Sequence, residues 1–235
     1  MSLTVDIDVT NLRAYSKKTR MPFYPLTLWV IAKVINAHDE FKYNWDRNGN
    51  LIQWDYVSPS YTAFHKDDKD LTKMVAEYSD NLVTFCNRVT ADRERYKNVR
   101  TVLENQPLNF FDASCLPWVR YKHFDICVFD EGKFLAPLVT WGKYEQVQDR
   151  WMMLFTMNIY HAVADGFHLS RFFAKCKSWC LLWNNWIVIC RDCFVKLPVF
   201  LDSGTFLGKN KRNSLLQSEG LCVINRVWKQ RWTGK

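Results

Sequence analysis

The chain has 235 residues, enough for one sizeable domain or one and a half, and its 48% hydrophobic and 16% aromatic content supplies a core that needs no disulfides. Its formal charge is +8, but lysines and arginines are interleaved with acids instead of gathered on one stripe, which argues against a nucleic-acid partner. Eight cysteines lack the regular spacing of a disulfide scaffold, so we expect reduced thiols and a cytoplasmic location.

Two further classes are disfavoured. The longest apolar-leaning stretch without charges, 178–190, is shorter than the ~20 residues of a membrane span and contains Asn184 and Asn185. The N-terminus lacks the pattern of a secretory signal. Cys190 and Cys193 form a lone CxxC with half the ligands of a zinc site, so we expect no membrane partner and no metal.

The first half of the chain alternates between strand and helix patterns. Residues 3–9 alternate apolar and polar side chains, which predicts a half-buried strand. Pro25 stands in the first turn of a broadly apolar helix. Strands are predicted over 51–54 and 61–65, preceded by an Asn-Gly-Asn turn at 48–50 and separated by a Ser-Pro turn.

The middle of the chain predicts one long helix over 71–96, with room for a break at its centre. Residues 124–129 and 134–141 flank Asp-Glu-Gly-Lys at 130–133, which is a hairpin signal. The expected fold class is α/β in the α+β sense, a mixed sheet covered by helices in two layers.

The most informative run is 160–168, Tyr-His-Ala-Val-Ala-Asp-Gly-Phe-His, between a strand predicted over 152–160 and a helix predicted over 169–179. A histidine at a strand end, here His161, is well placed for proton transfer because imidazole titrates near neutrality. Asp165 is expected to fix the turn, cap the helix or meet a cation from elsewhere, and the glycine after it to permit a sharp reversal.

His161-x-x-x-Asp165-Gly166 resembles the HxxxDG signature of coenzyme-A-dependent acyltransferases. The longer string HAVxDGFH, with the helix that follows it, resembles the trimeric chloramphenicol acetyltransferases in particular. The similarity covers roughly residues 2–180. It also rests on the strings at 23–25, 54–65, 114–119, 136–144 and 171–173.

The resemblance implies a two-layer acyltransferase fold and transfer of acetyl from acetyl-CoA to a hydroxyl of chloramphenicol, a reaction that confers antibiotic resistance. It implies direct transfer in a ternary complex, without metal or acyl-enzyme. It also implies a homotrimer with active sites at subunit interfaces, where His161 of one subunit faces a pocket built largely by its neighbour, with Ser114 across the cleft.

The catalytic roles carried over from the family are four. His161 is the general base, and Ser114 donates to the tetrahedral oxyanion, an interaction worth about 3 kcal/mol in comparable sites. Thr140 holds a water near the same intermediate, and Asp165 orients the loop. The structural alternatives are a buried histidine that satisfies a core hydrogen bond, a turn serine, a β-branched strand residue and a helix N-cap.

The binding roles are carried by aromatic and aliphatic side chains. Trp118 and Tyr144 resemble residues that line the cofactor tunnel, and Ile126, Phe134 and Leu138 are candidates for the apolar wall that receives the aromatic part of the acceptor. The alternative for the aromatic pair Trp118 and Tyr144 is ordinary core packing. The second histidine of the string, inside the predicted helix, is interpreted as structural.

Several positions depart from the family pattern. Tyr160 replaces a histidine and Ala164 a cysteine, and neither position is the base. Asp112 stands where many relatives have asparagine, and its carboxylate would oppose an oxyanion at Ser114 unless it points away. Relatives also have a segment ahead of the first strand, with an arginine that pairs with the motif aspartate. We therefore expect Asp165 to lie buried without its cation.

We divide the chain into a catalytic domain over 1–180, missing the usual N-terminal segment, and an atypical tail over 181–235, disordered or frameshifted. The tail loses periodicity and carries a basic cluster at 209–212. Two alternatives stay open for the function. One is a catalytically impaired fragment or binding-only homologue, and the other is an acyltransferase for another acceptor, such as a lipoyl thiol.

Overall fold

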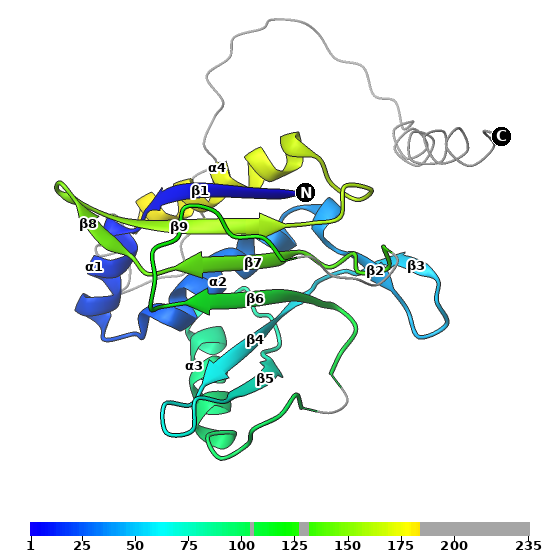
Figure 1. The fold of residues 1–235 in the computed structure, drawn as a ribbon, viewed down its shortest axis with the longest axis horizontal. Coiled ribbons are helices and arrows are strands. Elements are labelled where there is room, and N and C mark those ends of the chain that lie inside the picture. The colour runs from blue at the N-terminus through cyan, green and yellow to red at the C-terminus, as the bar shows by residue number, and fades with distance from the viewer. Residues whose placement is uncertain (104–105, 127–131, 184–235) are drawn as a thin grey trace, which may run out of the picture. The chain divides into compact units, whose positions relative to one another are not determined.

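The computed structural model describes residues 1–103, 106–126 and 132–183, all within the compact unit Met1–Arg191. A mixed sheet runs through it in the order β1-β9-β7-β6-β4-β5, with β8 beside β9 (Figure 1). β4, β6 and β7 are parallel to one another, and the remaining pairs are antiparallel. The strands are β1 (Ser2–Asp8), β4 (Ser58–Phe64), β5 (Leu71–Val75), β6 (Phe110–Leu116), β7 (Leu138–Gly142), β8 (Glu145–Val147) and β9 (Arg150–Asn158).

Helices cover one face of this sheet, which makes the two-layer fold predicted from the sequence. They are α1 (Thr10–Thr19), α2 (Phe23–Asn36), α3 (Leu82–Arg95) and α4 (Gly166–Leu182). The strands turn large side chains such as Phe111, Trp141 and Phe155 toward them, and all three are buried. α2 is apolar on nearly every side because it lies between the sheet and its neighbouring helices. A small hairpin of β2 (Tyr43–Trp45) and β3 (Leu51–Gln53) follows a 3-10 turn at Asp39–Phe41.

The opposite face of the sheet is polar, and the segment between β6 and β7 runs back across it. The Tyr121 hydroxyl donates to the carbonyl oxygen of Thr140 at 2.9 Å, and the backbone nitrogen of Lys143 donates to the carbonyl oxygen of Val119 at 3.0 Å. A Cβ at Gly142 would meet the Tyr121 ring at 3.0 Å, so a glycine here permits the close approach. The crossover segment is therefore docked on the sheet.

Several sequence predictions are confirmed. The first strand, the helix that begins near Pro25, the turn around Gly49, the strand before the HxxxDG run and the helix after it all form. Residues 51–53 and 58–64 are strands close to the predicted ranges.

The predicted helix over 71–96 is wrong in its first half. Residues 71–75 form β5, in which Thr72 and Met74 are buried and alternate with more exposed residues, the period of a strand. The helix α3 begins only after Asn81, whose side chain accepts a hydrogen bond from the Thr84 backbone at 2.9 Å.

Three turn predictions also fail. The Ser-Pro pair, Ser58 and Pro59, opens β4, a position where a residue without N–H is tolerated. The predicted hairpin of 124–129 with 134–141 does not form, because residues 124–126 are not a strand and β7 pairs with β6 and β9 instead. Residues 127–131 of this prediction lie outside the described residues. The expected need for a glycine at position 166, to permit a sharp reversal, is also wrong, because Gly166 has no positive φ and a Cβ there would meet nothing within 4 Å.

Candidate active site

A row of hydroxyl side chains crosses the polar face of the sheet. Ser114 on β6 lies opposite Thr140 on β7, Thr140 opposite Thr156 on β9, and Thr156 opposite Thr4 on β1. The hydroxyls of Thr4 and Thr156 are 2.8 Å apart, and the Thr156 hydroxyl donates to that of Tyr121 at 3.2 Å. Sequence reasoning found Ser114 and Thr140 but missed Thr4, Thr156 and Tyr121, although Thr4 occupies a polar position in the alternating strand predicted over 3–9.

Ser114 and Thr140 differ in what surrounds them. Ser114 is half-buried inside β6, so the alternative of a turn serine is wrong. Thr140 is fully buried, and its Oγ1 has no hydrogen-bond partner among the described residues. A buried hydroxyl left in this state costs about 1–3 kcal/mol, which is consistent with a place for a polar group that the chain itself does not supply.

Asp112 lies two residues before Ser114 on the same face of the sheet. Its Oδ1 is 2.7 Å from Nζ of Lys73 on β5, and the two side chains are 16% and 36% exposed. The carboxylate is therefore paired, so it does not face Ser114 as an uncompensated charge. Lys73 was missed by sequence reasoning because its position was assigned to a helix.

His161 lies in the turn between β9 and α4 and is exposed, so the alternative of a buried core histidine is wrong. Its Nδ1 is 3.2 Å from the carbonyl oxygen of Ala164. Because a carbonyl oxygen only accepts, we assign the proton to Nδ1, and the neutral ring then carries its lone pair on Nε2. The turn thus presents an exposed basic nitrogen.

Asp165 caps α4. Its Oδ1 accepts from the backbone nitrogens of Phe167 at 2.9 Å and His168 at 3.2 Å. The hydrogen bond from the His168 backbone, joined by that from the His168 ring, lowers the pKa of Asp165. Nδ1 of His168 is 2.7 Å from Oδ1 of Asp165 and 3.2 Å from the Asp165 backbone nitrogen. It would have to donate to the first and accept from the second, so only one of these hydrogen bonds forms at a time. We assign the shorter, charge-assisted one, in which Nδ1 donates to Oδ1.

This geometry corrects one expectation and confirms two others. Asp165 is 51% exposed at its side chain and has partners, so the expected buried, unpaired charge is absent from the described structure. Its alternative role as an N-cap is confirmed, and so is the structural role of His168.

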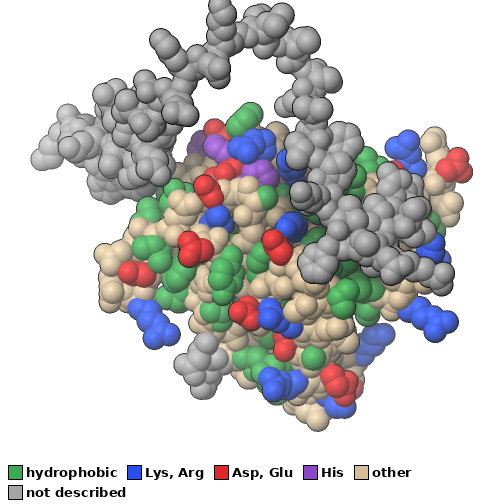
Figure 2. Space-filling model, turned by 180° about the vertical axis from the view of Figure 1, so that it is seen from behind, with side chains coloured by type: hydrophobic (Ala, Val, Ile, Leu, Met, Phe, Trp, Pro, Cys, Tyr) green, Lys and Arg blue, Asp and Glu red, His purple; other side chains and the backbone are tan. Residues whose placement is uncertain are grey.

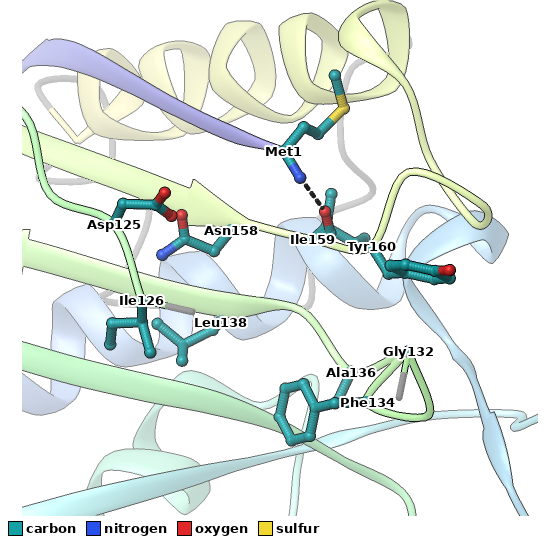
Figure 3. Close-up of a pocket in the computed structure, with 10 residues that line it drawn as sticks. All are labelled: Met1, Asp125, Ile126, Gly132, Phe134, Ala136, Leu138, Asn158, Ile159 and Tyr160. Carbon is teal, nitrogen blue, oxygen red and sulfur yellow. Dashed lines mark hydrogen bonds between the residues drawn. The ribbon is translucent and has the colours of Figure 1, made fainter. Parts of the chain in front are cut away.

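The three residues of the predicted apolar wall meet in one cavity. Ile126, Phe134 and Leu138 line a cavity of about 330 Å³ at the end of the sheet where β9 leads to His161 (Figure 3). Asn158 and Tyr160 come to it from the end of β9. The volume falls in the range of small-molecule sites.

The predicted cofactor residues lie at the other end of the sheet, past the ends of β6 and β7 (Figure 1). Trp118 is 60% exposed and packs edge-to-face against Phe64, with ring centroids 4.8 Å apart. Tyr144 is partly buried and packs against Trp151, and the guanidinium of Arg13 lies 3.7 Å from the Trp151 ring centre and 5.4 Å from that of Tyr144. Trp118 is thus open to a ligand, while Tyr144 also serves ordinary packing.

A single chain does not bring His161 to Ser114. Two inter-strand steps, about 10 Å, separate Ser114 from Thr156, and His161 follows Thr156 by five residues toward the far end of β9. The described chain therefore carries the predicted catalytic residues His161 and Ser114 at separate places.

Other kinds of site find little support in the described ranges. No cluster of three or more potential metal-ligating His, Cys, Asp or Glu residues occurs within 1–103, 106–126 and 132–183. No helix in these ranges has the length and apolar character of a membrane span. Figure 2 shows positive and negative side chains interspersed on the helix-covered side. The CxxC pair and nearly all of the predicted tail lie outside the described residues.

Comparison with known proteins identifies the family. A family model described as chloramphenicol acetyltransferase matches residues 1–177. The chain belongs to the chloramphenicol acetyltransferase family. It is 33% identical over 188 residues to a chloramphenicol acetyltransferase of Clostridium butyricum, covering 79% of this chain and 86% of that protein. It is 32% identical over 181 residues to one of Escherichia coli, covering 76% and 84%.

Solved structures of this family and of its fold relatives match the architecture. A chloramphenicol acetyltransferase superposes with a TM-score of 0.67 at 19% identity, covering 77% of this chain and 87% of that chain. A dihydrolipoamide acetyltransferase of Azotobacter vinelandii superposes with a TM-score of 0.60 at 17% identity, covering 80% and 84%. At these identities the likeness shows the shared fold. With the family, it makes the chain an acyltransferase.

Proposed function

We propose that this acyltransferase moves the acetyl group of acetyl-CoA to a hydroxyl of chloramphenicol, with His161 as the general base. The observation that carries the proposal is the His161 turn, in which Nδ1 of an exposed histidine lies 3.2 Å from the Ala164 carbonyl oxygen, a geometry that supports Nε2 as the base.

The proposed reaction balances without a covalent enzyme intermediate or a metal. Nε2 of His161 takes the proton of the acceptor hydroxyl as its oxygen attacks the carbonyl carbon of the thioester. The carbonyl electron pair moves onto oxygen, and the Ser114 hydroxyl donates to the resulting oxyanion. The intermediate then expels the CoA thiolate, which takes the proton from His161, and an acetyl ester is released.

Assembly into a homotrimer completes the proposed site. Because His161 and Ser114 lie apart in one chain, they meet if His161 of one subunit faces the sheet of its neighbour. The half-buried Ser114 would then meet the reacting atoms, and Thr140 beside it would hold a water through its Oγ1, which has no partner among the described residues.

Acetyl-CoA is assigned to the end of the sheet that carries Trp118 and Tyr144, and the acceptor to the cavity of Ile126, Phe134 and Leu138 at the other end. The exposed Trp118 ring suits stacking on a nucleobase, and Lys143, exposed beside Tyr144, suits a phosphate. Both substrates would thus approach the hydroxyl row from opposite ends of the sheet.

We further propose a cytoplasmic enzyme with its catalytic domain over 1–180 and an appended tail over 181–235. Cys86, Cys115, Cys176 and Cys180 are free thiols, which suits a reducing compartment.

Thiol release from acetyl-CoA, followed with and without chloramphenicol, tests the proposal. We expect chloramphenicol-dependent release by the wild type, its loss in His161→Ala, and a reduction of about 100-fold in Ser114→Ala. His123→Ala, a change at an exposed histidine of the crossover segment, serves as the matched control and should keep the wild-type rate.

Unchanged rates in both site variants would overturn the proposal. Faster release with dihydrolipoamide than with chloramphenicol would favour acyl transfer to a lipoyl thiol. Chloramphenicol binding without release would favour a binding-only homologue.

A further inference from the structure

Asn158 is a buried amide in the wall of the cavity lined by Ile126, Phe134 and Leu138. It is the last residue of β9, 8% exposed, and lies opposite Leu138 of the same cavity. Neither Nδ2 nor Oδ1 has a hydrogen-bond partner among the described residues. In Figure 3 its side chain lies among those of Asp125, Ile126 and Leu138.

Buried amides are normally paired, because each unsatisfied donor or acceptor loses its bonds to water without replacement. The described residues leave both unsatisfied: Ile126 and Leu138 are apolar, and the Asp125 carboxylate, which also lines the cavity, makes no hydrogen bond to Asn158. A ligand in this cavity that presents both an acceptor and a donor would satisfy the amide.

We propose that Asn158 determines acceptor specificity by hydrogen bonding, through its amide, to a second polar group of the acceptor, away from the hydroxyl that is acetylated. This rests on the proposed function, because it places the acceptor in the cavity. The ligand class is a neutral alcohol that carries an amide or a second hydroxyl beside an apolar group.

The sheet sets the distance between the two polar groups. Asn158 follows Thr156 of the hydroxyl row by two residues on the same face, a step of about 7 Å along the strand. The reacting hydroxyl is placed near Ser114, two inter-strand steps from β9, so about 12 Å at most separates it from the group bound by Asn158. The Asp125 carboxylate, which also lines the cavity, disfavours anionic acceptors.

The test uses the full chain and a binding measurement that does not depend on turnover. Chloramphenicol binding is measured by calorimetry for the wild type, Asn158→Leu and Gln146→Leu. Asn158→Leu removes the amide with little change in volume, and Gln146→Leu removes an amide from the exposed strand β8 as a matched control. Thermal unfolding and acetyl-CoA binding report whether each variant is folded.

We expect the Kd of chloramphenicol to rise roughly five- to hundredfold in Asn158→Leu and to stay unchanged in Gln146→Leu. The melting temperature of Asn158→Leu should be equal or higher, because an unsatisfied amide has been removed from the free protein. A merely structural asparagine would instead lower it.

An unchanged Kd in Asn158→Leu would overturn the inference, as would no measurable binding of chloramphenicol to the wild type. A lower melting temperature together with equal weakening of acetyl-CoA and chloramphenicol binding would also overturn it. If the wild type binds chloramphenicol through Asn158 but releases no thiol, the proposed function fails while this inference stands.

Discussion

The pairing of Lys73 with Asp112 gives a quantitative prediction about the oxyanion. Asp112 lies two residues from Ser114 on one face of β6, a separation of about 7 Å. Lys73 compensates its charge at 2.7 Å. If Lys73 is replaced by methionine, the carboxylate faces the negative charge that develops beside the Ser114 hydroxyl.

The magnitude follows from the separation. Two unit charges about 7 Å apart repel by about 2 kcal/mol at an effective dielectric constant of about 20. Asp112 is only 16% exposed, so water screens this interaction in part. We expect Lys73→Met to lower kcat by about 5- to 30-fold.

The assay is thiol release from acetyl-CoA at saturating chloramphenicol. Asp112→Asn removes the charge itself and should leave kcat equal or higher, and the double variant Lys73→Met/Asp112→Asn should return close to wild type. Added salt should reduce the loss in Lys73→Met.

Lys33→Met is the matched control, because Lys33 pairs with Asp80 at the same 2.7 Å but on α2, on the helix side of the sheet. A double variant as slow as Lys73→Met, or equal losses in Lys73→Met and Lys33→Met, would refute the electrostatic reasoning.

Three further predictions concern stability. Because the pKa of Asp165 is lower in the folded chain, Asp165→Asn should be less stable than the wild type at pH values above the unfolded-state pKa of about 3.9. The difference in the free energy of unfolding, measured in urea, should vanish as pH falls through the folded-state pKa. A difference that grows toward low pH would contradict this. Tyr121→Phe should lose about 1 kcal/mol in the same measurement, because its hydroxyl ties the crossover segment to Thr140; no loss would contradict the docking. Phe155→Ala, at a fully buried ring, should cost about 3–5 kcal/mol, and a cost below about 1 kcal/mol would argue against the core as described.

The sequence predicts best where one period dominates or a string is long. β1 alternates apolar and polar residues, β9 is a nearly continuous apolar run, and α2 is apolar enough to be recognised as a core helix. The HxxxDG run is fixed by its neighbours in the sequence, so the turn, the cap at Asp165 and the helix after it could all be placed.

The parts that failed depend on contacts distant in sequence. The sequence predicts helix where β5 lies, because Leu71–Val75 is too short to show a strand period and only its pairing with β4 reveals a strand. For the same reason the sequence did not indicate that Lys73 pairs with Asp112, which lies 39 residues further along the chain. Asn158 gave no signal, because an amide at a strand end is noteworthy only once the cavity around it is known.

The central claim is that His161 of one subunit acts with Ser114 of another, and mixing two inactive variants tests it most directly. Equal amounts of His161→Ala and Ser114→Ala are unfolded together, refolded and assayed for chloramphenicol-dependent thiol release. Random assembly pairs an intact His161 with an intact Ser114 at about a quarter of the interfaces, so we predict recovery of about a quarter of the wild-type rate. A mixture no more active than either variant alone would contradict the account.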